Sequence, residues 1–382
     1  MEKQKICFIV ASPGTARSFL YTHMANLGKL YEVHLVANFQ SSEDQMIFND
    51  IGVVCHSVTI QRKIRLLADI KALNKVRKIF KSEKFTCVHS VTPKAGLLTS
   101  IAGWVTRVPH RIHIYTGQVW ATRTGFMRFL LKTIDKIIAR LNTNLLVDGE
   151  GQRRFLIEND VLTENNSQVL ANGSITGVEL DKFVVSKEIR ERERAKFNFR
   201  ETDVVYIFLG RLTHDKGIGE LFQAFDRLAS QYDNVKLVLY GNDEGDYDLK
   251  VNNYTNIRRN INYFYPGRTS RPYEALQVAD VFVIPTWREG FGMSVIEAQG
   301  LGLPVITSDT YGVLDATVEG ITGLRCHVGD SMSLYECMLD YYNEPLLRIE
   351  HGKAGKKRVE YLFDNRIVSH AWVCYYLSLL GS

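Results

Sequence analysis

Several features that would place a protein in a special class are missing from this sequence. Its six cysteines form no Cys-x-x-Cys pair and no Cys/His cluster at zinc-finger spacing, so a disulfide scaffold or a zinc module is excluded. The apolar run Ile6–Val10 is too short for a signal peptide. The longest weakly polar stretch, Ala95–Val105, falls short of the ~18–20 residues that a membrane-spanning helix needs. We therefore expect reduced thiols, a cytoplasmic location and only peripheral membrane contact.

Repeats at solenoid periods and low-complexity tracts are also missing. With 382 residues, 45% hydrophobic and 23% charged, the chain has the composition of an ordinary soluble protein of about two domains. Its formal net charge of +5 is too balanced for a disordered polyelectrolyte and too weak to imply nucleic-acid binding by itself.

The positive charge is unevenly distributed. Residues 1–180 carry 23 basic and 14 acidic side chains, whereas the remainder carries 24 basic and 28 acidic ones. Between Gln61 and Leu141, 17 lysines and arginines are accompanied by three acidic residues among many apolar side chains. This pattern favours docking of the N-terminal half on an anionic membrane surface. The alternative is a set of solvated helix faces whose long side chains lie over apolar surface. No RNA-binding signature accompanies the basic residues, so we expect no nucleic-acid partner.

Short β-branched runs alternate with longer segments of helical period, which predicts an α/β protein with two doubly wound parallel sheets. The expected strands are Ile6–Val10, Tyr31–Val36, Cys87–Ser90, Arg111–Tyr115 and Leu145–Val147, then Val204–Leu209, Val235–Tyr240, Ile261–Phe264, Val281–Ile284 and Val305–Thr307, and Ile64–Ser82 is typical of the helices between them.

The charge-dense segment 186–200 has few core residues and is the expected domain junction. We accordingly predict an N-terminal domain over 1–185, a C-terminal domain over 200–360 and a final segment over 361–382. Within that last segment, Asn365–Leu380 has a one-sided apolar stripe, which predicts a helix that docks back on a domain.

The strongest chemical signal follows the expected strand Val281–Ile284. A polar turn carries Glu289, the triplet Gly290, Phe291 and Gly292 opens a helix, and Glu297 lies in its second turn. Backbone N–H groups at such a helix start can bind an anion beyond the strand edge. The two carboxylates could accept hydrogen bonds from sugar or ribose hydroxyls. In the alternative interpretation, Glu289 is a loop carboxylate and Glu297 merely complements the helix dipole.

Two further loops follow strands. After Val204–Leu209, Arg211 and Lys216 bracket a loop in which a guanidinium and an ammonium can together hold a diphosphate, although either could be a solvated cation. After the first strand, Gly14 could let the loop 11–17 approach a phosphate. That loop is not a G-x-G-x-x-G fingerprint and no acidic ribose partner follows the second strand, which disfavours a NAD enzyme.

Together these residues resemble glycosyltransferase family 4, the retaining sugar-nucleotide transferases of the GT-B fold. The resemblance rests on the Gly-Arg-Leu-x-x-x-Lys-Gly segment beginning at Gly210, the glutamates eight apart around Gly-Phe-Gly, the segment 302–306 and Gly323. It is close in the C-terminal half and mainly architectural in the N-terminal half. The order of elements from Arg111 to Asp181 is most similar to the bacterial branch that builds capsule, O-antigen and other lipid-linked glycans.

The resemblance implies two Rossmann-like domains around a cleft and a role for each motif. Glu289 would contact the donor sugar, Glu297 would hold the ribose, and Arg211 and Lys216 would neutralise the diphosphate leaving group. Gly290, Phe291 and Gly292 would present backbone N–H groups, and Gly14 would lie under the diphosphate. The leaving phosphate would take the acceptor proton on the same face, so the configuration would be retained without a protein base. Metal would be dispensable and no other cofactor is expected, with a UDP-sugar as the favoured donor.

Some residues depart from the family. Thr116 stands where many relatives have a histidine, and His113, three residues earlier, would more often be a satisfied core residue than its substitute. Arg17, His113, Thr116 and Gln118 are candidate acceptor-side contacts, together with Trp120. The usual Asn-Gly-Val-Asp segment is stretched and ends at Glu179. Asp246 and Asp248 have the Asp-x-Asp spacing of metal-dependent glycosyltransferases, but we interpret them as solvated carboxylates.

The expected activity is therefore transfer of a hexosyl or N-acetylhexosaminyl group, with retention, from a nucleotide-sugar to a polyprenyl-diphosphate-linked glycan in surface polysaccharide synthesis. The protein would act peripherally on the inner face of the cell membrane. Two alternatives remain open at this point: a sugar-nucleotide epimerase on the same fold, and a non-catalytic scaffold of a glycan-assembly complex.

Overall fold

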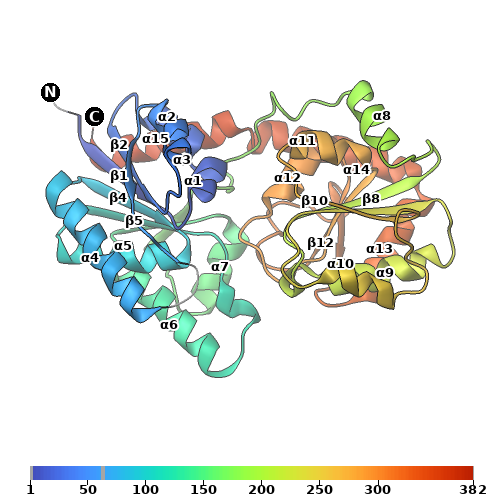
Figure 1. Cartoon of the computed structure of the whole chain (residues 1–382), viewed down its shortest axis with the longest axis horizontal. Helices are drawn as coiled ribbons and strands as arrows, with labels where there is room; N and C mark the ends of the chain where they lie inside the picture. Colours follow the sequence, from blue (N-terminus) through green and yellow to red (C-terminus); the bar gives the residue numbers. More distant parts are fainter. Residues whose placement is uncertain (1–2, 62–64, 382) are drawn as a thin grey trace. The chain divides into compact units, whose positions relative to one another are not determined.

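The computed structural model describes residues 3–61 and 65–381. It divides into two compact units, the first formed by residues 1–176 with 366–382 and the second by residues 177–365. Each unit is a parallel sheet with helices on both faces (Figure 1), which confirms the expected α/β fold.

The strands are β1 Lys5–Ile9, β2 Glu32–Ala37, β3 Val54–Ser57, β4 Cys87–Val91, β5 His110–Tyr115, β6 Asn144–Val147 and β7 Ser167–Val169, then β8 Val204–Leu209, β9 Val235–Tyr240, β10 Tyr263–Gly267, β11 Val281–Ile284, β12 Val305–Ser308 and β13 Gly323–Cys326. The α-helices are α1 Pro13–Phe19, α2 Tyr21–Leu27, α3 Ser42–Asn49, α4 Leu66–Glu83, α5 Pro93–Val105, α6 Gly125–Leu141, α7 Glu150–Glu158, α8 Lys187–Ala195, α9 Ile218–Ala229, α10 Tyr247–Lys250, α11 Pro272–Ala275, α12 Met293–Gly300, α13 Ser331–Asn343, α14 Pro345–Leu362 and α15 Asn365–Leu380.

The first unit has the strand order β3-β2-β1-β4-β5-β6-β7, with every pair parallel. Alternate residues of its central strand serve opposite faces, as the strand period of two requires. Cys7 and Ile9 join the core under α4 and α5, whereas Phe8 faces the aromatic side chains of α15. Because both faces are covered, the strands are buried along most of their length.

The C-terminal helix α15 docks on the first unit, as its apolar stripe predicted. Trp372, which is 1% exposed, lies between two imidazoles and stacks on His23 at 4.2 Å and on His89 at 4.9 Å between ring centroids. The Tyr376 hydroxyl and His89 Nδ1 are 2.8 Å apart. The last helix therefore completes the core of the unit that contains the first strand.

The second unit has the strand order β10-β9-β8-β11-β12-β13, again all parallel. One contiguous core joins this sheet to helices α9, α12 and α13. The strand pattern is the continuous apolar run expected of a sheet covered on both faces.

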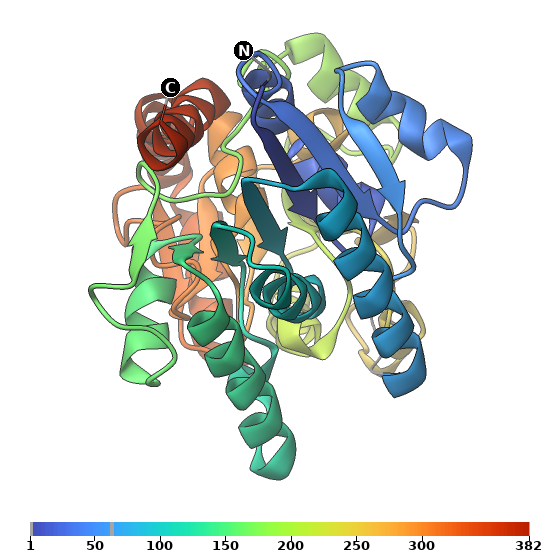
Figure 2. The ribbon, with the colours of Figure 1, turned by 90° about the vertical axis from the view of Figure 1, so that its left-hand side faces the viewer.

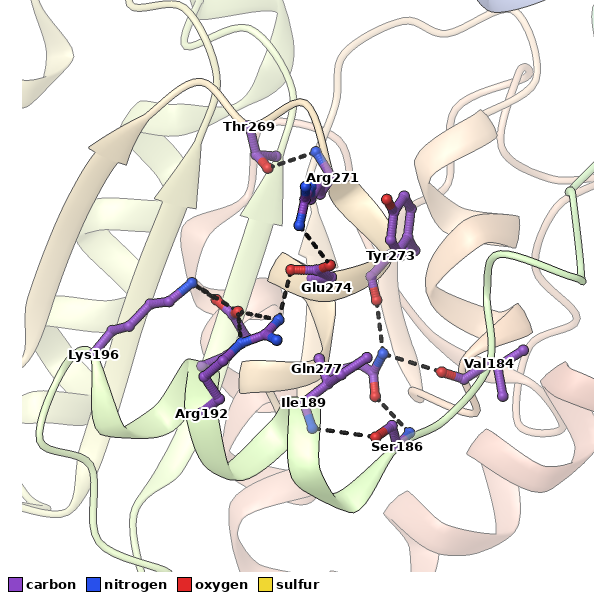
Figure 3. Close-up of polar contacts among 11 residues, drawn as sticks. Val184, Ser186, Ile189, Arg192, Lys196, Thr269, Arg271, Tyr273, Glu274 and Gln277 are labelled. Carbon is purple, nitrogen blue, oxygen red and sulfur yellow. Dashed lines mark hydrogen bonds and ion pairs between the residues drawn. The ribbon is translucent and has the colours of Figure 1, made fainter.

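The expected domain junction at 186–200 requires correction, because this segment belongs to the second unit. It forms α8, and Arg190 Nη2 on α8 lies 2.6 Å from Asp280 Oδ1. Gln277 donates to the carbonyl of Val184 and accepts from the amide of Ser186 (Figure 3). Arg192 on the same helix pairs with Glu274 at 2.6 Å (Figure 3). The charges of this segment are ion-pair partners for its own unit, and the chain passes between units at residues 176 and 177.

Other differences are local. The short strands β3 and β7 were not predicted, and β10 begins at Tyr263 rather than at Ile261. The expected helix start at Ile64 lies outside the described residues, as do Arg62 and Lys63 of the basic span. All six cysteines are free thiols and four of them are buried, as expected. No helix among the described residues is long and apolar enough to cross a bilayer.

Candidate active site

The candidate site lies at the carboxyl edge of the second sheet, where the strand order reverses. From β8 the chain goes to β9 and β10 on one side and then returns to β11 on the other. Strands β8 and β11 are parallel neighbours, with Tyr206 paired to Val281. The loops that follow these two strands therefore leave the same edge at a topological switch point, where ligands of open α/β sheets bind.

Lys216 and Glu289 meet at this switch point. Lys216 Nζ, from the loop after β8, lies 2.6 Å from Glu289 Oε1, from the loop after β11. Their side chains are 11% and 22% exposed, so the pair is sheltered but reachable. Two residues that the sequence places 73 positions apart are thus partners. The cation predicted to hold a diphosphate and the carboxylate predicted to hold a hydroxyl-bearing group therefore lie side by side.

The two loops approach each other closely because the residue at their contact is a glycine, which has no side chain. Gly217 has a φ of +71°, and a Cβ built on it would lie 2.0 Å from the carbonyl oxygen of Pro285. The Thr286 hydroxyl donates across the same gap to the carbonyl of Asp215 at 2.9 Å. Any larger residue at position 217 would push the loops apart and separate the Lys216–Glu289 pair.

The Gly-Phe-Gly triplet forms the start of α12. Gly292 caps the helix with a φ of +90°, a left-handed conformation that favours glycine. Within the described residues, the amides of Gly290, Phe291, Gly292 and Ser294 have no acceptor. The Phe291 side chain is 1% exposed and packs edge-on against Phe363, so only its backbone is available to a ligand. The helix start thus has free donors for an anion.

Glu297 lies on α12 in a setting that penalises its charge. Burial, with a smaller contribution from the carboxylate of Glu179, raises its pKa from 4.5 to about 7. Within the described residues it has no hydrogen-bond or ion-pair partner, whereas Glu179 pairs with Lys182. Glu297 is therefore an unengaged acceptor at the same sheet edge as Glu289.

Arg211 does not join the Lys216–Glu289 pair. Its Nη1 lies 2.9 Å from Glu244 Oε2, and the two side chains are 43% and 37% exposed. Glu244 belongs to the loop after β9, and its backbone amide donates to the carbonyl of Leu212. The second predicted cation is thus at the same edge but is held by a solvent-exposed carboxylate.

The comparisons with known proteins agree with this geometry. The family model "Glycosyl transferases group 1" matches residues 189–358, and "Glycosyl transferase 4-like domain" matches residues 14–173. The capsular polysaccharide biosynthesis glycosyltransferase CapM of Staphylococcus aureus is 34% identical over 340 residues, covering 89% of this chain and 88% of its own. The chain belongs to glycosyltransferase family 4. It is a glycosyltransferase of the capsule and O-antigen branch, and none of the comparisons favours the epimerase or the scaffold.

Two further relatives extend the picture. A UDP-Gal:alpha-D-GlcNAc-diphosphoundecaprenol alpha-1,3-galactosyltransferase of Escherichia coli is 25% identical, covering 79% of this chain and 78% of its own. The crystal structure of Anabaena Alr3699/HepE in complex with UDP and glucose superposes with a TM-score of 0.81 at 17% identity, covering 99% and 100% of the two chains. That likeness shows the GT-B fold.

In this glycosyltransferase, Gly14, predicted for the donor side, and Arg17, predicted for the acceptor side, follow β1 at the other switch point, between β1 and β4. The predicted loop 11–17 is instead the start of α1, where the Ser12 hydroxyl caps the helix and Gly14 is exposed in the first turn. A Cβ on Gly14 would meet no atom closer than 3.9 Å, so the chain itself does not require glycine there. Arg17 is exposed on α1 and has no partner among the described residues.

Two of the predicted acceptor-side residues are core residues, which corrects their expected roles. His113 is 1% exposed, its Nδ1 lies 2.9 Å from the Ser90 hydroxyl, and burial lowers its pKa to about 3. Gln118 is also 1% exposed and accepts from Gln152 at 3.2 Å. Neither side chain has surface with which to contact an acceptor.

Of the remaining acceptor-side candidates, Thr116 is half-buried directly after β5, and Trp120 is buried. The Trp120 indole donates to Asp135 at 2.7 Å, and its ring stacks on Phe155. Trp120 therefore supports α6, whereas Thr116 stays a candidate contact at the strand edge.

The Asp-x-Asp segment is not assembled as a metal site. Asp248 pairs with Arg259 at 2.9 Å and accepts from the Tyr263 hydroxyl at 3.1 Å. Among residues 3–61 and 65–381, no three His, Cys, Asp or Glu side chains are grouped so that they could hold a metal ion.

Sequence reasoning missed a second ion pair between the loops after β8 and β11. Arg288 Nη2 lies 2.7 Å from Asp215 Oδ2, directly beside the Lys216–Glu289 pair. The signal available in the sequence was position, because each partner directly precedes a residue that the motifs had singled out. A charged residue next to a motif residue is common, however, and only the structure pairs these two.

Proposed function

We propose that this enzyme transfers a sugar, with retention of configuration, from a UDP-sugar to a polyprenyl-diphosphate-linked glycan. The observation that carries the proposal is the 2.6 Å contact between Lys216 and Glu289 at the switch point, beside the free amides at the start of α12. Cation, carboxylate and backbone donors are the groups needed to hold the diphosphate and the hydroxyls of one nucleotide-sugar.

In the proposed reaction, the bond between the anomeric carbon and the diphosphate oxygen breaks while the acceptor oxygen bonds to the same face of that carbon. The acceptor proton passes to the departing phosphate oxygen, so no protein base is required. Lys216 and Arg211 stabilise the negative charge that develops on the diphosphate. Glu289 orients the sugar hydroxyls and Glu297 accepts from the ribose. Gly14, at the switch point of the first sheet, stays a candidate contact for a phosphate.

The relatives support both substrates. HepE was crystallised with UDP and glucose and also with UDP-glucose. The Escherichia coli relative has a UDP-sugar donor and a diphosphoundecaprenol-linked acceptor in its name. The cations Lys216 and Arg211 supply the charge that a metal ion would otherwise neutralise. Transfer should therefore persist when EDTA is added, and a loss of transfer that Mg²⁺ or Mn²⁺ restores would contradict this part of the proposal.

A thermal-shift panel of UDP-, GDP-, ADP- and dTDP-sugars, with NAD as a control, tests the donor. A UDP-sugar should raise the melting temperature selectively because it binds only the folded state. Lys216→Ala and Glu289→Ala should each lower transfer by at least ~10²-fold, the scale for removing a preorganised contact to the transition state.

Lys357→Ala is the matched control for Lys216→Ala, since it removes the same charge from an exposed site on α14 of the same unit. It should keep both the thermal shift and the transfer rate. Wild-type rates in Lys216→Ala and Glu289→Ala would refute the site. Selective stabilisation by a different nucleotide would refute the donor while leaving the site intact.

We further propose that the first unit docks on the inner face of the membrane through the N-terminal ends of α4 and α6. The helices α4, α5 and α6 are neighbours on one face of the first sheet, and α4 and α6 extend beyond it (Figure 2). Leu66 and Leu67 at the start of α4 are 75% and 79% exposed, and Phe126 and Phe129 at the start of α6 are 75% and 67% exposed.

Basic residues accompany both apolar ends. Arg65, directly before α4, and Lys71 on α4 are exposed, and Arg123 is exposed just before α6. An amphipathic surface of this composition suits the boundary between the head groups and acyl chains of an anionic bilayer. Docking there would bring the enzyme to a lipid-linked acceptor. The alternative, solvated helix faces, explains the charges but not four large apolar side chains in water.

Flotation with phosphatidylglycerol liposomes tests the docking. Phe126→Ser together with Phe129→Ser should abolish flotation, and raising the salt concentration should weaken it in the wild type. Leu346→Ser is the matched control, because it removes a side chain that is 71% exposed on α14 of the second unit. Flotation that changes neither with the salt concentration nor with substitution of the two phenylalanines would reject the docking proposal. It would not affect the proposal for the donor site.

A further inference from the structure

Two ion pairs lie side by side between the same two loops of the second unit. Lys216 pairs with Glu289 at 2.6 Å, and the residues immediately before them, Asp215 and Arg288, pair at 2.7 Å. The Asp215 and Arg288 side chains are 20% and 18% exposed, so this second pair is largely sheltered from water. Each loop therefore contributes one anion and one cation, and the two ion pairs together connect the loops.

Asp215 is held to the loop after β11 by more than its carboxylate. Its backbone carbonyl accepts from the Thr286 hydroxyl and from the Trp287 amide, both at 2.9 Å. The Trp287 indole in turn donates to Glu220 Oε1 at 3.1 Å, in the first turn of α9. The backbone contacts fix the separation of the loops at Asp215, while the Asp215–Arg288 pair fixes the next position along the second loop.

We propose that Asp215 and Arg288 are positioning residues that set the geometry of the Lys216–Glu289 pair. This inference deepens the proposed function, because it rests on Lys216 and Glu289 being the donor contacts. Lysine has a long side chain with many rotamers, so the ammonium can reach several places unless its backbone is fixed. A displacement of about 1 Å is enough to lower a rate by ~10²-fold when the reacting groups must be aligned.

The charge state of the pair is constant under the conditions of an assay. Burial alone would raise the pKa of Asp215, but the Thr213 hydroxyl and the charges of Arg288 and Lys216 together lower it from 3.8. Asp215 is therefore ionised at neutral pH, and a pH dependence of the rate would have to come from another group.

A competing role for Arg288 is direct contact with the donor. Its Nε is buried and has no partner among the described residues, so this side chain keeps an N–H group that could donate to a phosphate. The two roles separate kinetically. A positioning residue lowers kcat and leaves the KM for the donor unchanged, whereas a residue that contacts the donor diphosphate raises that KM.

The test is a double-mutant cycle with Asp215→Ala and Arg288→Ala in the full chain. Each single variant should lower kcat by roughly 10–100-fold, with the donor KM and the UDP dissociation constant within about twofold of wild type. The double variant should lose no more than the worse single one, because the second substitution removes half of a pair that is already broken. Arg288→Lys should restore most of kcat, since the contact uses a single nitrogen.

The pair Asp248–Arg259 is the matched control, with a contact of 2.9 Å and exposures of 27% and 39% in the same unit. Asp248→Ala and Arg259→Ala should leave kcat within about twofold. If Asp215→Ala does not fold, Asp215→Asn keeps the shape and removes only the charge.

Multiplicative losses in the double variant, or a donor KM that rises with Arg288→Ala, would overturn the positioning role. Equal losses from the control pair would do the same, by showing that any ion pair of this unit matters. A wild type that does not bind UDP, or that binds UDP no better than Lys216→Ala, would instead overturn the proposed function on which the inference rests.

Discussion

Glu297 carries a proton at a pH where most glutamates have lost theirs. Burial raises its pKa to about 7, and the neighbouring Glu179 adds to the effect. A protonated carboxyl is a weaker hydrogen-bond acceptor than a carboxylate. If Glu297 holds the ribose as we propose, the donor must bind best when this group is ionised.

The affinity for a UDP-sugar should therefore rise between pH 6 and 8 with a midpoint near 7, which calorimetry at a series of pH values can measure. A UDP-sugar is the suitable probe because its diphosphate has no second protonation in this range, unlike a terminal phosphate. Glu297→Gln should bind more weakly at pH 8 and show a flat profile. A profile that keeps its slope in Glu297→Gln would assign the titration to another group.

Thr92 is a strained residue at the switch point of the first sheet. It follows β4 with a φ of +74°, which is unusual for a β-branched side chain, and its buried hydroxyl has no partner among the described residues. Such conformations persist where the surroundings impose them, and they concentrate at functional sites.

Thr92→Gly should raise the free energy of unfolding by roughly 1–2 kcal/mol, because glycine adopts this φ without strain. It should also lower transfer, because backbone strain of this kind concentrates where function imposes it. The control is Lys84→Gly, which relieves a φ of +55° after α4 and should raise stability without changing transfer. Wild-type kinetics in Thr92→Gly would leave the strain without a catalytic role.

At the scale of residues, sequence patterns found side chains but not their surroundings. Lys216 and Glu289 were predicted from two separate loops and are in contact. His113 and Gln118 were equally visible as polar residues near a strand end, but both are buried. Burial depends on which helix covers that end of the strand, and a local pattern does not contain this information.

Among the elements, α6 combines an exposed apolar end with a buried carboxyl. Asp135 is 4% exposed and accepts from the Trp120 indole at 2.7 Å. Burial raises its pKa from 3.8 to about 7, although the hydrogen bond from Trp120 opposes the shift. Between these values the folded state holds a proton that the unfolded state has lost. The free energy of unfolding therefore falls as the pH rises from about 4 to about 7 and is level above that.

Asp135→Asn should remove this loss, since asparagine does not ionise and can still accept from Trp120. The variant should be more stable than wild type at pH 8, by on the order of 1–3 kcal/mol, and similar to it near pH 4. Urea unfolding of both proteins at several pH values measures the difference. A difference that does not change with pH would mean that Asp135 stays ionised in the folded state.

Elements were predicted well where their apolar period was long. The central strands β1, β8 and β11 and the helix α15 lie where their patterns placed them. The missed strands β3 and β7 are edge strands of four and three residues, and β3 has no fully buried residue. A strand of this kind takes its conformation from its single neighbour rather than from its own sequence.

For the molecule as a whole, the error in the domain boundary has a physical cause. Segment 186–200 has the composition of a linker, but Arg190 and Arg194 both reach Asp280 and thereby attach α8 to the second unit. A segment dense in charged residues is exposed as a linker only when its charges lack ion-pair partners. The boundary at 176–177 lies in a stretch without a compositional signal.

The two units differ in how the chain builds them, and this leads to a prediction about fragments. Residues 177–365 are continuous and enclose one core, whereas the first unit needs residues 366–382 to cover Phe8 and His89. A fragment 177–365 should unfold cooperatively by itself. A fragment 1–176 should be less stable and aggregate, and a peptide of residues 366–382 should rescue it by returning Trp372 to its position between His23 and His89.

The same fragment 177–365 separates the contributions to donor binding. Because Lys216, Glu289, Glu297 and the amides of α12 all belong to the second unit, it should bind UDP no more than about tenfold more weakly than the full chain, a difference of about 1.4 kcal/mol. Lys216→Ala in the fragment should abolish that binding. A fragment that folds but does not bind UDP would mean that the diphosphate depends on the first unit, and Gly14 and Arg17 on α1 would then be the residues to replace.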